Sequence, residues 1–115
     1  MLILNTKMTL KQLEDLEEES FFDDMVKAVV DINKEIIAVS AELHSDLEEL
    51  LLDHGSSQKS LYGINIYYDS GEIEFDSLIN PPRNRDDGYP RGGRYVASPE
   101  SREKIERVVR KWIEI

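Results

Sequence analysis

The hydrophobic pattern of residues 25–41 has a period of two, which is typical of a β-hairpin. β-Branched residues crowd both arms, and Asn33 and Lys34 can form the two-residue turn between them. Pairing through this turn sets Val30 opposite Ile37 and makes one face of the hairpin continuous and apolar. We expect that face to lie in the core, whereas the other face mixes apolar residues with charged ones.

Residues 61–79 show a similar alternation, with Ser70 and Gly71 at the turn. This turn pairs Tyr68 with Ile73 and places tyrosine and aliphatic side chains on the buried face. The pattern therefore predicts a second hairpin, and the two hairpins predict an antiparallel sheet of four to five strands.

Three other segments carry apolar residues at intervals of three and four, which is the period of an amphipathic α-helix. They are residues 10–20, 46–54 and 99–113. The N-caps expected for them are Thr9, Ser45 and Ser98, in that order. The sequence thus predicts an α+β protein in which three helices pack mainly on one face of the sheet.

The 115 residues, 40% of them hydrophobic and 33% charged, are enough for one globular domain, so we expect a single domain over residues 1–115. Cysteine is absent, which excludes a disulfide framework, a thiol nucleophile and a thiolate zinc site. No apolar run approaches the ~20 residues that a membrane span needs. These features favour a cytoplasmic location and give no reason to expect a membrane partner.

The net charge of -10 is distributed unevenly along the chain. Residues 1–80 contain 5 basic and 18 acidic side chains, whereas residues 81–115 contain 9 basic and 6 acidic ones. The acidic body would repel polyanions, so a nucleic-acid partner is not expected. Only the last third of the chain could contact an anion.

The motifs of P-loops, dinucleotide-binding folds, zinc proteases and serine hydrolases are all absent. The best local cluster is Glu42, His44 and Asp46, at the corner between the first hairpin and the second helix. A histidine beside two carboxylates can bind a divalent metal or act as an acid/base pair, and Asp31 or Asn65 could join from the sheet. Each residue also has an ordinary structural role, which we favour; no other cofactor is predicted.

The second candidate is residues 81–97, a segment rich in arginine, glycine and proline that predicts a flexible loop. Arginine pairs with phosphate and carboxylate groups, and tyrosine can stack on a ring. The residues concerned are Arg83, Arg85, Arg91, Arg94, Tyr89 and Tyr95. Three interpretations stay open: a solvated tether, contact with the protein's own acidic body or another subunit, and binding of an external anion.

The segments VKAVVDI, AELHSD, GINIY and IEFDSLIN, in this order, resemble an uncharacterised family of short bacterial and archaeal proteins. The resemblance implies a compact domain and supplies no activity, ligand or functional residues. We expect a small binding or interaction module that contacts an anionic ligand or an acidic protein surface through the arginine segment. The alternative is a metal-dependent or acid/base enzyme centred on His44.

Overall fold

The computed structural model of the protein describes residues 1–16 and 21–115. In this part of the chain a five-stranded antiparallel sheet has the strand order β1-β4-β3-β5-β6. Its strands are β1 (Leu2–Ile3), β3 (Met25–Asp31), β4 (Ile36–Val39), β5 (Leu61–Tyr67) and β6 (Ile73–Glu74). A second, two-stranded parallel sheet pairs β2 (Met8–Thr9) with β7 (Ile113–Glu114). The predicted α+β class with an antiparallel sheet is confirmed.

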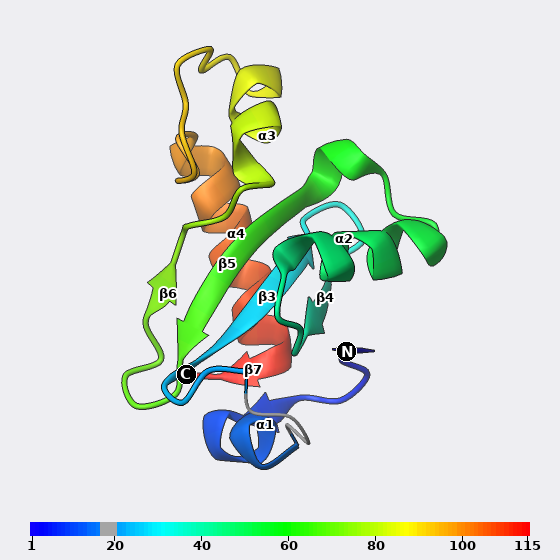
Figure 1. Ribbon diagram of the computed structural model, residues 1–115, viewed down its shortest axis with the longest axis vertical. Helices are drawn as coiled ribbons and strands as arrows, with labels where there is room; N and C mark the ends of the chain where they lie inside the picture. Colours follow the sequence, from blue (N-terminus) through cyan, green and yellow to red (C-terminus); the bar gives the residue numbers. More distant parts are fainter. Residues whose placement is uncertain (17–20) are drawn as a thin grey trace.

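The described residues contain four α-helices and a short 3-10 turn (Figure 1). They are α1 (Leu10–Leu16), α2 (His44–Asp53), η1 (Gln58–Ser60), α3 (Asn80–Asp86) and α4 (Pro99–Trp112). The first predicted helix extended to residue 20, and its last four residues lie outside the described part. The fourth helix, α3, occupies a segment that was predicted to be a loop.

Two of the three predicted N-caps, Thr9 and Ser98, are present in the structure. Thr9 and Gln12 form a reciprocal capping box, with backbone-to-side-chain bonds of 2.9 and 3.1 Å. Ser98 caps α4, because its Oγ accepts a 3.2 Å bond from the amide of Ser101. The N-cap expected at Ser45 is wrong: α2 begins two residues earlier than predicted, after Leu43, without a side-chain cap.

The register of the first hairpin is confirmed, because Val30 pairs with Ile37 and Ala28 with Val39. Asp31 stabilises its turn, since one carboxylate oxygen accepts 2.9 Å bonds from the amides of Asn33 and Lys34. The same side chain is fully buried. Local hydrogen bonds therefore reinforce the register that the apolar pattern predicts.

The register of the second hairpin differs from the prediction by two residues. Ile73 pairs with Ile66 instead of with Tyr68. Tyr68 donates its amide to Asp24 O, on the segment before β3, and Gly71 at φ 72° donates to Tyr67 O in a wider loop. Tyr68 therefore contacts the segment before β3 in place of pairing with Ile73 across a two-residue turn at Ser70 and Gly71.

The sheet separates two hydrophobic clusters. The larger one combines the even-numbered side chains of β3 with α1 and α4, and it contains Val108 and Val109. The smaller one joins Val29 to Leu47 and Leu51 of α2. Helix α2 therefore covers the sheet face for which the sequence predicted a mixed character, and α4 covers the opposite face (Figure 1).

Candidate functional site

The corner between β4 and α2 directs its three candidate residues to different places. The backbone of Ser40 has a φ of 71°, in the left-handed region, and this turns the chain away from β4. Glu42 is exposed and Asp46 is half-buried, whereas His44 is buried against the sheet. In the described residues no group of three or more His, Asp and Glu side chains is arranged to hold a metal ion. The structure thus does not bring Glu42, His44 and Asp46 together as one metal site.

His44 is tied to β5 by its ring. Its Nε2 lies 2.8 Å from Ile64 O, a contact in which the protonated ring nitrogen donates. The ring packs beside Gly63, where an added Cβ would lie 3.2 Å from His44 Cδ2 and 2.4 Å from the side chain of Ser77. Burial lowers the pKa of His44, and the charge of Lys27 acts in the same direction. A neutral ring that donates from Nε2 keeps Nδ1 as a proton acceptor.

Among the side chains of β5, Asn65 acts on His44, because its side chain raises the pKa of the ring and so opposes the effect of burial. Asn65 is buried and donates from its Nδ2 to Glu74 at 2.8 Å, and Tyr67 donates its hydroxyl to the other Glu74 oxygen at 3.1 Å. Among the described residues the Oδ1 of Asn65 is buried without a donor. Both His44 and Asn65 are buried, and their contacts are those of a structural role.

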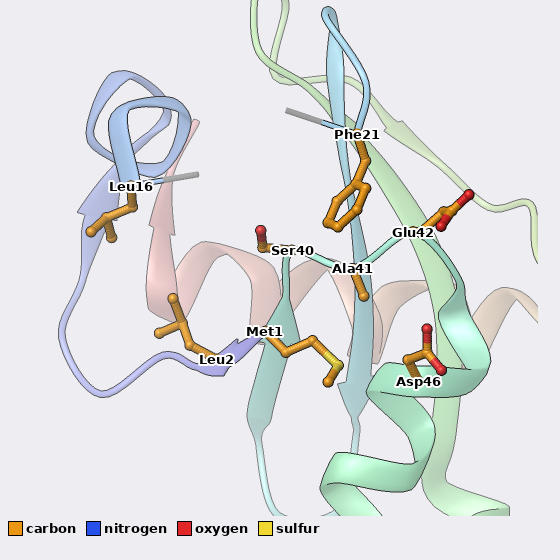
Figure 2. A pocket seen from close by; sticks show the side chains of 8 residues that line it. All are labelled: Met1, Leu2, Leu16, Phe21, Ser40, Ala41, Glu42 and Asp46. Atoms are coloured by element: carbon orange, nitrogen blue, oxygen red, sulfur yellow. The ribbon is translucent and has the colours of Figure 1, made fainter. Parts of the chain in front are cut away.

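Glu42 and Asp46 instead line a groove of about 620 Å³ (Figure 2). Its other walls carry Met1, Leu2, Leu16, Phe21, Ser40 and Ala41. Within residues 1–16 and 21–115, neither carboxylate has a hydrogen-bond or ion-pair partner for its side chain. The groove therefore combines apolar side chains with polar surface, and at one side it carries two carboxylates that have no partner among the described residues.

Asp31, which the sequence offered as a partner for His44, has a different role. Besides the turn amides, it accepts a 2.6 Å bond from the hydroxyl of Ser56, which lies just after α2. Three donors therefore occupy this buried carboxylate. The contacts place Asp31 in the turn scaffold and away from any shared site with Glu42.

The arginine segment begins as the helix α3, not as a loop. Two prolines, Pro81 and Pro82, lie in the first turn of α3, where a missing amide proton costs no intrahelical bond. Arg83 is buried: its Nε donates to Leu61 O at 2.9 Å, and its guanidinium forms an ion pair with Glu48 of α2. Arg83 is thus held by the protein's own acidic body and is closed to an external anion.

Two asparagines one helical turn apart fix the rest of the segment. Asn80 accepts from the amide of Gly63 at 2.8 Å and donates to the carbonyls of Gly63 and Arg94 at 3.0 and 2.8 Å. Asn84 donates to the carbonyls of residues 93 and 95 and accepts from the amide of Ala97. The side-chain amide of Asn80 pairs with Gly63 as a neighbouring strand would, so α3 covers the part of the β5 edge that β6 leaves open.

A third tether links the end of α3 to the sheet and α4. The carboxylate of Asp87 accepts from the hydroxyl of Tyr62 at 2.8 Å and from that of Ser101 at 3.1 Å. Burial raises the pKa of Tyr62 to about 12, so its hydroxyl stays a donor at neutral pH.

The outward side of the segment carries the remaining candidates. Arg94 forms an ion pair with Asp76 at 2.9 Å. Tyr89 and Tyr95 are 40% and 53% exposed, and Arg85 and Arg91 are exposed as well. In the described part of the chain the side chains of Arg85 and Arg91 have no hydrogen-bond or ion-pair partner.

Sequence reasoning missed the residues that organise this segment. Glu48, Asn80 and Asn84 were not candidates, because a single Glu or Asn in a polar stretch has no distinctive pattern. A usable signal was present in Asn80-Pro81-Pro82, which is typical of a helix start, and in the four-residue spacing of the two asparagines.

The fold and the two surfaces define a small α+β protein that has a groove lined by two carboxylates and several apolar side chains, and a projecting segment that carries exposed arginines. The chain belongs to a family described as protein of unknown function DUF5674, whose model matches residues 2–112. No curated protein and no solved structure matches the chain. No helix in the described residues has the length and apolar character needed to cross a membrane.

Proposed function

We propose that the protein is an interaction module that contacts an acidic surface of a protein partner through Arg85, Arg91, Tyr89 and Tyr95. The observation that carries this proposal is the contrast between the two sides of the segment. Its inner side is fixed by buried polar contacts of Arg83, Asn80 and Asn84. Its outer side carries two arginines that have no side-chain partner within residues 1–16 and 21–115, beside two exposed tyrosines.

An ordered segment binds with a smaller entropic cost than a flexible tether does. Arginine and tyrosine are also the side chains that most often dominate binding energy at protein interfaces. The four residues belong to α3 and the segment after it, which form one end of the long axis of the molecule (Figure 1). A projecting surface suits a macromolecular partner better than a small anion, which is usually held in a concave site.

The test compares two variants that remove the same charge. Arg85→Gln/Arg91→Gln changes the proposed contact, and Lys59→Gln/Arg110→Gln removes two exposed cations elsewhere. With a fluorescent poly-glutamate peptide at low ionic strength, we expect the first variant to lose about two- to thirtyfold in affinity, since exposed ion pairs contribute about 0.2–1 kcal/mol each. The control variant should bind like the wild type.

Added salt tests whether the peptide binds through exposed charges, and inorganic phosphate tests whether the same arginines form a small-anion site. Binding through exposed charges should weaken as added salt shortens the Debye length below ~10 Å. Equal affinity of both variants for the peptide would refute the proposal. Binding of phosphate alone at millimolar concentration, lost in Arg85→Gln/Arg91→Gln, would show a small-anion site instead.

A further inference from the structure

A second surface, independent of the arginine segment, also has the properties of a binding site. It is the groove of about 620 Å³ between the N-terminal segment and the β4–α2 corner. Its volume lies within the range of roughly 300–1,000 Å³ that binding pockets occupy. In Figure 2 the side chains of Leu2 and Leu16 lie to the left of Ala41, that of Met1 extends below Ala41, and the carboxylates of Glu42 and Asp46 lie to the right.

Three of the large apolar side chains that line the groove are exposed. Met1 is 67% exposed, Leu16 45% and Phe21 38%, although all three line the same cavity. Isolated apolar residues are common on protein surfaces, but several around one cavity mark a site of interaction. The three side chains therefore provide apolar area that a partner could bury.

The polar side of the groove determines which partner fits. Glu42 and Asp46 have no cationic partner among the described residues, so burying them under an uncharged or acidic ligand would leave two carboxylates desolvated and unpaired. Two lysine or arginine side chains, one for each carboxylate, would compensate these charges and could cover apolar surface with their aliphatic stems. Charge complementarity thus selects a basic segment over an acidic one.

We infer that this groove binds a segment of a protein partner in which leucine-like apolar side chains alternate with lysine or arginine. The apolar side chains pack on Leu16 and Phe21, and one basic side chain pairs with Glu42 and another with Asp46. The recognition is that of an amphipathic peptide in a groove, with apolar anchors for affinity and charges for orientation.

The experiment uses the full chain and two labelled peptides of twelve residues, one built from leucine and lysine and one in which glutamate replaces every lysine. Fluorescence anisotropy should show binding of the leucine/lysine peptide and at least tenfold weaker binding of the leucine/glutamate peptide. We expect Glu42→Gln/Asp46→Asn to lower the affinity for the basic peptide about tenfold, and Leu16→Ser/Phe21→Ser to lower it by a similar factor.

The matched control is Glu49→Gln/Asp53→Asn, which removes one Glu and one Asp from exposed positions of α2, outside the groove. It should bind the basic peptide like the wild type, and thermal unfolding should show that all variants fold. An equal loss in the control would mean general attraction to the acidic body and would overturn the inference.

Two other results would also overturn it. Equal binding of the acidic peptide would show that Glu42 and Asp46 do not select the ligand. A dimer in sedimentation velocity that Leu16→Ser/Phe21→Ser dissociates would show that a second copy of the chain covers the groove.

Discussion

The buried ion pair between Arg83 and Glu48 gives the sharpest test of the structure, because the sequence leaves open whether Arg83 lies in a solvated loop, binds an external anion or contacts the acidic body of the protein. The perturbation is Arg83→Met, which keeps most of the aliphatic stem and removes the charge and all donors. The side chains of Arg83 and Glu48 are only 5% and 15% exposed. A loop residue in water would tolerate this change, whereas a buried pair would not.

The magnitude follows from the partners that the variant leaves behind. Removing one member of a buried ion pair costs about 3–5 kcal/mol, since the other charge stays desolvated. Glu48 keeps a 3.2 Å hydrogen bond from Gln58 and some contact with water, which favours the lower end of that range. The carbonyl of Leu61 also loses its bond from Arg83 Nε. We therefore expect a loss of about 3 kcal/mol in the free energy of unfolding.

Urea unfolding followed by circular dichroism measures this loss as a lower midpoint at an unchanged slope. The control Arg85→Met removes an exposed arginine from the same helix and should change stability by less than about 0.5 kcal/mol. Arg83→Met/Glu48→Met should recover most of the loss, because no unpaired charge remains. A cost below about 1 kcal/mol for Arg83→Met, or an equal cost for Arg85→Met, would refute the buried pair.

Three further predictions concern the sheet and its contacts. Because the pKa of His44 is lowered in the folded state, the unfolded chain binds a proton first as the pH falls below about 6.5, so the free energy of unfolding should decrease there. This pH dependence should be smaller in His44→Gln. NMR titration of the His44 ring should give a pKa below that of a free histidine. Gly63→Ala should destabilise the protein by about 1–3 kcal/mol, since a Cβ would come within 2.4 Å of Ser77; a melting temperature equal to that of the wild type would contradict the close approach. Trp112 is only partly buried, and its indole donates to Glu35 O at 2.8 Å. Trp112→Phe should therefore lower the free energy of unfolding in urea by about 1 kcal/mol, the contribution of one hydrogen bond. A cost above about 3 kcal/mol would show that the side chain is fully buried.

Local sequence patterns were sufficient for elements that local interactions stabilise. The first hairpin has the predicted register because its apolar alternation and the Asp31 bonds to the next turn favour the same pairing. The start of α4 was predictable because Ser98 caps an amide only three residues away. In each case the partners are close in the chain, so the spacing of residue types contains the information.

The candidate sites were predictable only as regions. The sequence placed Glu42, His44 and Asp46 at one corner, but it could not show that His44 turns to Ile64 while the two carboxylates line the groove. Which way a side chain points at a corner depends on the backbone conformation at Ser40 and on the position of β5, and neither is a property of the corner's own residues.

Only the tertiary structure decided the roles of residues 80–97. The bond between Arg83 and Glu48 spans 35 positions, and that between Asn80 and Gly63 spans 17. Such contacts depend on two distant elements being already packed, so no periodicity of charge or hydrophobicity along the chain reports them. The sequence by itself determined the first hairpin with its register, the existence of three of the four described helices, and an excess of positive charge near the end. The packing of α3 against β5 determined which arginine is buried inside the protein and which arginines lie at the surface.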